Sequence, residues 1–418
     1  MKTIMTDKRK QVKFTVIIPT RERCDVLHSS LKTCTTQEYD NLEIIVSDNF
    51  SQDKTKEVVE SFKDNRIKYI NTGKRVSMTN NWEFALSHVN DGYVAYLGDD
   101  DGLLPGALSE VNEIINKTGC EAVSCKPAVY FWPNWYINES KKNILIIPLR
   151  TSLVKRISKE MLIDVINFKR DPCELPLLYR GFVSYNAIKR VMRESGRFFH
   201  SIIPDIYSGI ALACVLESYY YSFKPYAISG TSRHSIGGTA DSHNGEDNKV
   251  VKKFFSENNL PFHSKLALAK TTSIIVAESF LQAQDHISCA KHFRIDMKKC
   301  IKMAIKEAVY FPEEKYSLVV ETVNKIARLN RINNYTPKLI AENKNKPTRF
   351  HYPVLGFNIA RGQVVVNCVE FGAQNIYEAA VLCKHILIIR KLNYFSLIRI
   401  IKTTLSLIKR EILNKIQY

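Results

Sequence analysis

Several common signatures are missing from this sequence of 418 residues. Its ten cysteines contain no Cys-x-x-Cys pair, which argues against a zinc site or a compact disulfide framework and favours reduced thiols in a core. No Gly-x-Gly-x-x-Gly follows the first expected strand and no Gly-x-x-x-x-Gly-Lys occurs, so a dinucleotide-type or Walker-type phosphate loop is disfavoured. No apolar run reaches the length of about 18 residues that a membrane-spanning helix needs, so we expect no span.

Acidic residues are in short supply relative to basic ones. Lysine and arginine number 60 against 42 aspartates and glutamates, and the formal net charge is +18. Such an excess attracts anionic partners, among them nucleotide sugars, nucleic acid and an acidic membrane face. No zinc-finger spacing or RNA-binding aromatic signature is present, so we do not expect nucleic acid as a partner. Residues 1–13 are basic and lack the apolar stretch of a signal peptide, which predicts a cytoplasmic protein.

Strands and helices alternate along the first hundred residues. Short apolar runs predict strands at 14–18, 42–46, 67–70 and 93–97, and a longer run predicts one more at 122–131. This alternation predicts an α/β fold, with a Rossmann-like, mostly parallel sheet covered by helices on both faces. In such sheets ligands bind beyond the carboxyl ends of the strands.

Polar clusters stand at three of these strand ends. The fourth strand stops at three consecutive acids, Asp99 to Asp101, the second closes on Asp48, and the first on Pro19-Thr20-Arg21-Glu22-Arg23. Adjacent carboxylates repel one another, so a protein that holds them together usually supplies a cation. Mg²⁺ takes oxygen ligands and is commonly held by carboxylates together with substrate phosphates. The cluster therefore predicts a metal–diphosphate site, and the alternative is a solvated acidic turn before a helix.

In combination these motifs resemble the nucleotide-sugar half of inverting family 2 glycosyltransferases with the GT-A fold. They read Val-Ile-Ile-Pro-Thr-Arg-Glu-Arg, Glu-Ile-Ile-Val-Ser-Asp-Asn-Phe-Ser-Gln-Asp and Tyr-Leu-Gly-Asp-Asp-Asp-Gly-Leu-Leu-Pro-Gly-Ala-Leu. The resemblance covers 14–115 well and continues more loosely to about 237. It implies an enzyme dependent on Mn²⁺ or Mg²⁺, which moves a sugar from a nucleoside-diphosphate sugar to a hydroxyl of a saccharide or lipid-linked acceptor.

The resemblance also implies roles for single residues. The donor-binding residues would be Pro19, Thr20, Arg23, Asp48, Asn81, Asp99 and Arg233, and the metal ligands Asp100, Asp101 and His234. The family's acidic motif usually reads Asp-x-Asp-Asp before a proline four residues on, and here Gly98 stands where its first aspartate would be. The register is therefore open, and Asp100 aligns best as the metal ligand. Asn81 as a plain surface amide, and Arg233 with His234 as a solvated loop, are the alternatives.

Asp205 is the candidate general base. An inverting transferase needs one carboxylate to take the proton from the acceptor hydroxyl, and Asp205 begins an expected helix where the family keeps its catalytic acidic residue. A helix N-terminus lowers a carboxylate's pKa, so we expect this base to be ionised. The alternatives are an ordinary acid at a helix start, and Glu194 as the base.

Three regions are expected: a GT-A catalytic domain at 1–240, a mainly helical domain at 241–383, and a basic amphipathic helix at 384–418. That last helix has an apolar stripe flanked by lysines and arginines, which suits an anionic membrane surface on the cytoplasmic side. Docking on its own domain or on a partner subunit is the alternative, and the oligomeric state is open. Two other functions also stay open, a sugar nucleotidyltransferase and a non-catalytic GT-A-like binding or scaffold protein. The first is disfavoured because 19–23 contains no glycine.

Overall fold

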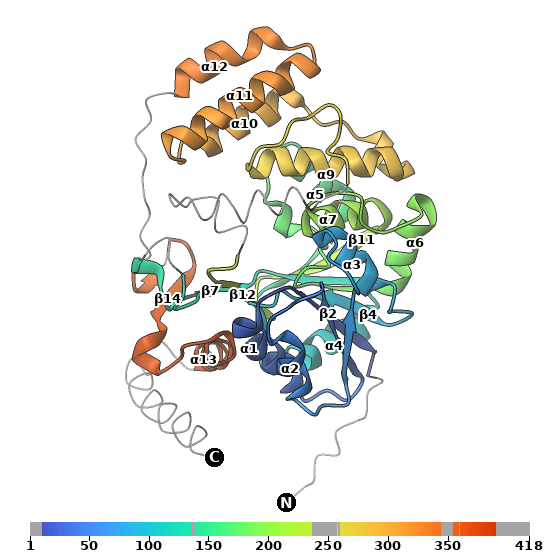
Figure 1. Cartoon of the computed structure of the whole chain (residues 1–418), viewed down its shortest axis with the longest axis vertical. Helices are drawn as coiled ribbons and strands as arrows, with labels where there is room; N and C mark the ends of the chain where they lie inside the picture. Colours follow the sequence, from blue (N-terminus) through green and yellow to red (C-terminus); the bar gives the residue numbers. More distant parts are fainter. Residues whose placement is uncertain are drawn as a thin grey trace, which may run out of the picture.

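The computed structural model describes residues 11–135, 139–235, 257, 260–343, 354–358 and 360–389 (Figure 1). Its main sheet begins with four parallel strands in the order β3-β2-β1-β4. These are β1 (Phe14–Thr20), β2 (Leu42–Asp48), β3 (Ile67–Asn71) and β4 (Tyr93–Tyr96). The two central strands are apolar and buried almost throughout, as strands covered on both faces are.

The sheet continues through β10, β6, β11 and β9. Their bounds are Phe182–Ser184 for β10, Ala122–Cys125 for β6, Ser218–Ser222 for β11 and Leu153–Ile157 for β9. β10 runs antiparallel to its neighbours β4 and β6, and β9 runs antiparallel to β11. The other strands share one direction, so the predicted mostly parallel α/β sheet is confirmed.

The single strand predicted over 122–131 is wrong. The chain leaves the main sheet after β6, and β7 (Ala128–Phe131) belongs to a second sheet of order β13-β14-β8-β7-β12-β5. Lys126 and Pro127 separate the two strands, and proline has no N–H for the hydrogen-bond ladder of a sheet. The remaining bounds near this break are β5 (Gly102–Leu103), β8 (Ile144–Pro148) and β12 (Ala227–Thr231).

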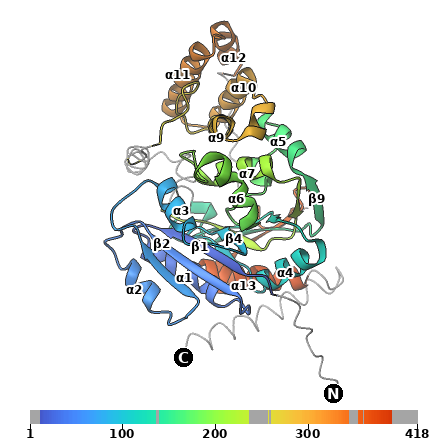
Figure 2. The same ribbon diagram turned by 90° about the vertical axis from the view of Figure 1, so that its right-hand side faces the viewer.

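Helices cover both faces of the main sheet (Figures 1 and 2). Val16 and Ile18 of β1 pack in the core beneath the helices of one face, whereas Ile17 packs in the core of the other. The first face carries α1 (Cys24–Thr35), α2 (Thr55–Glu60) and α4 (Ala107–Thr118). The second carries α3 (Met78–Leu86), α5 (Ser158–Ile166), α6 (Tyr185–Ser195) and α7 (Pro204–Val215).

A further helical layer lies over α5 and α7 (Figure 2). It consists of α9 (Thr272–His286), α10 (Met297–Ala308), α11 (Glu313–Leu329) and α12 (Thr336–Asn343). α9 contacts α5 and α7 directly, and α10 and α11 pack together beyond it. The predicted helical C-terminal region is therefore present.

The chain then returns to the N-terminal half. β13 (Gly356–Asn358) pairs with β14 (Gln363–Asn367), which pairs with β8, and α13 (Ile376–Ile389) packs against α1. The expected domain boundary at 383 thus falls inside a helix, where Lys384 Nζ lies 2.8 Å from Glu110 Oε1. Most of the predicted amphipathic segment, 390–418, lies outside the described residues. Of the helices described, none is long and apolar enough to cross a bilayer.

Candidate functional site

The three consecutive acids occupy the turn that follows β4. The backbone closes this turn with a hydrogen bond from Asp101 N to Gly98 O of 3.1 Å. Asp99, Asp100 and Asp101 are only 2, 5 and 0% exposed, respectively. Because burial of unpaired charge is costly, each carboxylate must have partners within the protein. The cluster is therefore not the solvated turn considered as the alternative.

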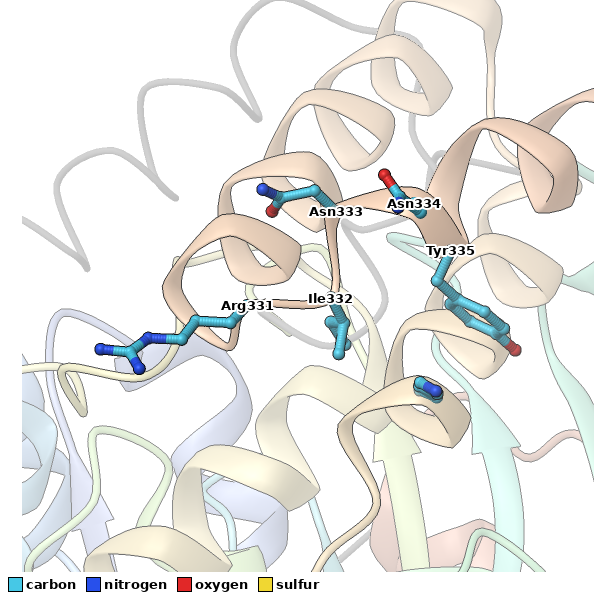
Figure 3. Close-up of a pocket in the computed structure, with 6 residues that line it drawn as sticks. Arg331, Ile332, Asn333, Asn334 and Tyr335 are labelled. Carbon is cyan, nitrogen blue, oxygen red and sulfur yellow. The ribbon is translucent and has the colours of Figure 1, made fainter.

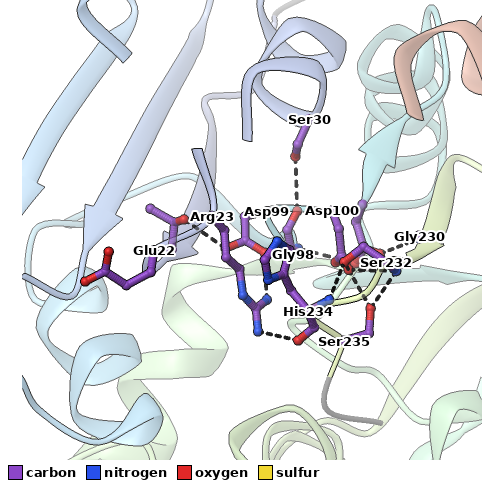
Figure 4. A network of polar contacts seen from close by, with 12 residues as sticks. Glu22, Arg23, Ser30, Gly98, Asp99, Asp100, Gly230, Ser232, His234 and Ser235 are labelled. Carbon is purple, nitrogen blue, oxygen red and sulfur yellow. Dashed lines mark hydrogen bonds and ion pairs between the residues drawn. The ribbon is translucent and has the colours of Figure 1, made fainter. Parts of the chain in front are cut away.

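Asp99 joins the ends of β4 and β1 (Figure 4). Its Oδ2 accepts a 2.8 Å hydrogen bond from Thr20 Oγ1, and its Oδ1 lies 2.9 Å from Arg23 Nη1. Arg23 also donates from Nη2 to the backbone oxygen of His234 at 2.7 Å. Burial raises the pKa of Asp99, and the Arg23 guanidinium opposes that rise. Residues predicted to bind the donor thus converge at one sheet edge.

Asp100 holds the loop that follows β12. Its Oδ2 accepts hydrogen bonds from Ser232 Oγ at 2.7 Å and from Ser235 Oγ at 2.6 Å (Figure 4). Its backbone oxygen accepts a 3.0 Å hydrogen bond from Nε1 of Trp132, a buried residue that follows β7. Among the described residues Asp100 forms no ion pair, in contrast to its two neighbours. Its negative charge is therefore the least neutralised of the three.

Asp101 is enclosed by backbone and side-chain donors. Gly230 N donates to its Oδ1 at 2.7 Å, Gly98 N to its Oδ2 at 3.3 Å, and the Tyr179 hydroxyl also bonds to the carboxylate. Arg180 Nη1 lies 3.8 Å from its Oδ2. Burial raises the pKa of Asp101 to about 6 in spite of this guanidinium. With both oxygens engaged, Asp101 is placed to organise the turn.

Two glycines allow the chain segments to approach this closely. A Cβ at Gly230 would lie 1.7 Å from the backbone oxygen of Asp100, so no side chain fits there. A Cβ at Gly98 would lie 2.8 Å from the Tyr179 hydroxyl and 3.0 Å from Asp101 Oδ2. The position where the family's first aspartate would stand therefore has no room for one, because Tyr179 fills it.

Arg180 connects the acid cluster to the candidate base. Its backbone has φ of +60°, which is uncommon for a residue other than glycine. Its guanidinium lies over the Tyr179 ring at 4.3 Å and donates to Ser229 Oγ. The same guanidinium opposes the rise in the pKa of Asp205, so its charge acts on both Asp101 and Asp205.

Asp205 stands in the first turn of α7, as predicted. Its Oδ1 accepts a 2.8 Å hydrogen bond from Ile206 N. Burial nevertheless raises the pKa of Asp205 above its usual value, so the expectation of a lowered pKa is wrong. Loss of hydration outweighs the helix N-terminus at this half-buried position. The competing acid, Glu194, accepts a bond from Ser288 N at 2.7 Å and so faces the helical layer.

Asp48 and Asn81 are fixed within the protein. Asp48 accepts bonds from Ser51 N at 2.9 Å, Tyr69 OH at 2.6 Å and Asn71 Nδ2 at 3.1 Å, at the same sheet edge as Thr20. Asn81 is buried, and its amide exchanges two hydrogen bonds with Ser47, the residue before Asp48. Asn81 thus tethers α3 to the end of β2, and is not a surface amide. Pro19 lies in β1 beside Ser47.

Arg233 and His234, in the loop after β12, contact Asp25 in the first turn of α1. His234 Nε2 is 3.0 Å from both carboxylate oxygens of Asp25, and Arg233 Nη2 is 3.7 Å from Asp25 Oδ2. Asp25 does not cap α1, whose N-cap is Arg23 and has no side-chain capping bond. In this arrangement the His234 ring faces α1, while its backbone oxygen receives Arg23. The contact joins the loop after β12 to the first turn of α1.

No group of three His, Cys, Asp or Glu side chains is arranged to hold a metal ion within the described parts of the chain. Asp100 and Asp101 adjoin each other, whereas the His234 ring lies on Asp25. Elsewhere, a depression of about 430 Å³ lies in the helical layer (Figure 3). It contains none of the predicted site residues and is lined by Lys298, Arg331, Ile332, Asn333, Asn334 and Tyr335.

Ser232, Ser235 and Tyr179 were missed by the sequence analysis. Each bonds an acid that is far away in the sequence, and hydroxyl residues are too common to signal such a contact. The glycine-rich segment around Gly230 was the available signal, because a close backbone approach requires glycine.

Comparison with known proteins relates part of the chain to a family. Residues 15–185 match the model described as Glycosyl transferase family 2. A stretch of 108 residues is 39% identical to the GalNAc(5)-diNAcBac-PP-undecaprenol beta-1,3-glucosyltransferase of Campylobacter jejuni. Residues 15–185 of this chain are thus similar to glycosyltransferase family 2. The match with the Campylobacter protein covers 25% of this chain and 35% of that protein, so the chain spans about a third of that relative's length.

Solved structures of glycosyltransferases are also similar to this chain. S. aureus TarS 1-349 in complex with UDP-GlcNAc has 14% identity and a TM-score of 0.47, over 81% of this chain and 94% of that one. The mannosyltransferase PcManGT of Pyrobaculum calidifontis, in complex with GDP-Man and Mn²⁺, has 13% identity and a TM-score of 0.35, over 80% and 88%.

Proposed function

We propose that this protein transfers a sugar, with inversion, from a nucleoside-diphosphate sugar to a hydroxyl of a saccharide or lipid-linked saccharide. The observation that carries the proposal is the convergence of Thr20, Arg23 and the acids Asp99 and Asp100 at one sheet edge. In α/β sheets of this kind the carboxyl ends of the strands form the ligand site. The family match supplies the reaction class.

In the proposed mechanism the chain holds the donor and activates the acceptor. Arg23 and Asp99 fix the ends of β1 and β4, beside which the nucleoside would lie. Asp205 takes the proton from the acceptor hydroxyl as its oxygen attacks the anomeric carbon from the side opposite the leaving diphosphate. Because Asp205 must be ionised for this step and burial raises its pKa, transfer should weaken on acidification at a higher pH than for an exposed aspartate.

A divalent ion fits this site as a ligand shared with the donor. Asp100 is the carboxylate without an ion pair, and Mg²⁺ or Mn²⁺ needs one or two carboxylates when substrate phosphates complete its shell. When bound, the ion would neutralise charge on the leaving diphosphate. Asp101, bonded on both oxygens, would keep the turn in place. His234 would have to leave Asp25 to join the ion.

The proposed acceptor is a saccharide carried on a lipid. The Campylobacter relative is named for an undecaprenol-linked acceptor, and the present chain carries a net charge of +18, which would draw it to anionic substrates and surfaces. A peripheral position on the cytoplasmic face of a membrane remains part of this proposal.

The proposal is tested by the product that leaves the donor. Purified protein with Mn²⁺ is incubated with UDP-GlcNAc, UDP-glucose or GDP-mannose and an undecaprenol-linked oligosaccharide, and nucleoside diphosphate and pyrophosphate are measured separately. We expect nucleoside diphosphate to be released. Pyrophosphate release would instead indicate a nucleotidyltransferase, and no release from any donor would contradict the proposed function.

Asp205→Asn should lower the transfer rate by about 10²- to 10⁴-fold, the usual contribution of a general base. The substitution keeps the size and the hydrogen bond from Ile206 N, so the fold should persist. The matched control is Glu194→Gln, which should transfer like the wild type. Equal loss of activity in both variants, or wild-type turnover in Asp205→Asn, would contradict the assignment of the base.

A further inference from the structure

Phe50 combines two features that folding alone disfavours. Its backbone lies in the left-handed region with φ of +56°, an outlier for a bulky residue. Its side chain is 42% exposed, although an aromatic ring stabilises a protein chiefly when it is buried. Glycine or asparagine would adopt the same backbone with less strain. Strained residues of this kind cluster at sites that bind ligands.

The strained conformation of Phe50 is enforced by the loops around it. On one side, Asn49 N donates to Thr20 O at 3.0 Å, which ties the residue before Phe50 to the end of β1. The Asn49 side chain also accepts a bond from Val76 N at 2.9 Å and donates to Val76 O at 2.8 Å. Asn49, directly before Phe50 in the chain, therefore links the end of β2 to the end of β1 and to the connection between β3 and α3.

The residue after Phe50 is held as firmly. Ser51 N donates to Asp48 Oδ1 at 2.9 Å, and Ser51 Oγ accepts a 2.8 Å bond from Glu22 N. Glu22 itself has φ of +53°, so two strained residues face each other across the ends of β1 and β2. The ring thus stands on a rigid support at the edge that carries Thr20 and Asp48.

Cationic groups lie at the same edge. Arg21, which follows β1, and Arg75, in the connection between β3 and α3, both form ion pairs with Glu257. The Arg75 Nε to Glu257 Oε1 distance is 3.2 Å, and Arg21 is bonded to the other carboxylate oxygen. Two guanidiniums that converge on one carboxylate can also attract an anionic ligand. An exposed ring and cations at one sheet edge are a combination that can hold nucleotides by stacking and by charge.

We propose that the Phe50 ring is a stacking platform for the nucleobase of the donor. This inference rests on the proposed function, because it requires a nucleoside-diphosphate donor. Stacking on a phenyl ring depends on the face of the base and tolerates different bases. The contact would therefore supply affinity for the nucleoside, while other groups select which base is bound.

Three substitutions separate the ring from the strain. Phe50→Gly removes both, Phe50→Ala removes the ring and leaves a strained backbone, and Phe50→Tyr keeps the ring. The dissociation constants for UDP and GDP are measured by calorimetry with Mn²⁺ present, and Tm is measured without ligand. We expect both constants to rise about tenfold in the glycine and alanine variants, as for one lost stacking contact. Phe50→Tyr should bind like the wild type.

Stability should change in the opposite sense to affinity. Phe50→Gly should have a Tm no lower than that of the wild type, because glycine relieves the left-handed strain. Ribose 5-phosphate, which has no base, serves as the control ligand and should bind all four proteins equally. If the ring only packs against the loop, its removal should lower Tm and leave the dissociation constants for UDP and GDP unchanged.

Equal affinity of Phe50→Gly and wild type for UDP and GDP overturns the inference and leaves the proposed function standing. If the wild type binds neither these two nor ADP and CDP, the proposed function and the inference are both overturned. Weaker binding of ribose 5-phosphate to Phe50→Gly would also overturn it, because the effect would then not come from the base.

Discussion

Buried carboxylates occur in two regions of the molecule with different partners. At the strand ends, Asp99 and Asp101 face the guanidiniums of Arg23 and Arg180. Such cations favour the charged form of an acid, in opposition to the effect of burial. The strand-end region therefore maintains negative charge close to the proposed donor site.

The buried acid of the helical layer has neutral partners in place of guanidiniums. Glu278 of α9 is fully buried and accepts hydrogen bonds from two neutral groups, Ser201 Oγ and, at 2.9 Å, Gln282 Nε2. Burial raises the pKa of Glu278 to about 7. Ser201 also accepts a bond from Thr79 through its backbone oxygen, so this acid lies where α9 meets the sheet's own helices. Burial raises the pKa of the acid in both regions, and the regions differ in that a guanidinium opposes this rise only at the strand ends.

The largest effect on this contrast should come from removal of a cation at the strand ends. Arg180→Met leaves Asp101 buried without its guanidinium, and we expect a loss of about 3–5 kcal/mol in the free energy of unfolding. The loss is measured by urea denaturation at pH 8 and should shrink toward pH 5, where Asp101 becomes protonated.

Two further variants check the origin of that loss. Arg180→Lys keeps the charge and should retain more stability than Arg180→Met. Adding Asp101→Asn to Arg180→Met should recover part of the loss, because no uncompensated charge remains. If the double variant is no more stable than Arg180→Met, the effect comes from lost packing of Arg180 over Tyr179 rather than from charge.

Replacement of Glu278 should raise the free energy of unfolding at high pH, whereas Arg180→Met should lower it. The pKa of Glu278 is about 7 in the folded protein and 4.5 in an ordinary glutamate. The folded state thus binds more protons between these values, and the wild type loses stability as pH rises from 4.5 to 7, by about 3 kcal/mol. Glu278→Gln removes this dependence, so its stability relative to the wild type should increase from pH 5 to pH 8.

The measurement is the difference in unfolding free energy between wild type and Glu278→Gln across this range, which cancels the other titrating groups. Glu321→Gln, at an exposed position of α11, is the control and should show a flat difference. A flat difference for Glu278→Gln as well would mean that Glu278 is already ionised near pH 5.

The smallest of these losses of stability should come from a methyl group added at Gly230, where the loop after β12 meets the turn after β4. In Gly230→Ala the new Cβ would lie 1.7 Å from Asp100 O, so the loop after β12 must shift. Overpacking of this kind costs about 1–3 kcal/mol. The shift would also weaken the bond from Gly230 N to Asp101, so donor affinity should fall with stability. Gly119→Ala strains the left-handed C-cap of α4 without any clash, so as a control it should lose stability and keep the donor affinity of the wild type.

The sequence placed the chemistry at one sheet edge because local patterns carry that information. Apolar runs of five residues that end in polar ones predicted β1, β2 and β4, and Asp48 and Asp99 follow from where those strands stop. Pro127, in contrast, divides the run 122–131 between two sheets, and an apolar pattern does not say which sheet a strand joins. In the same way, no local pattern indicated that β14, far along the chain, pairs with β8.

The sequence alone determined the parallel order of alternating strands and helices, the family motifs and the acid at the start of α7. Tertiary structure alone decided which partners the acids have. Ser235 reaches Asp100 across 135 positions of sequence, and Tyr179 fills the space beside Gly98. It also decided that burial raises the pKa of Asp205 where the helix position predicted a fall. Hydration and charge depend on everything that surrounds a group in space, whereas strand and helix patterns depend on near neighbours in the chain.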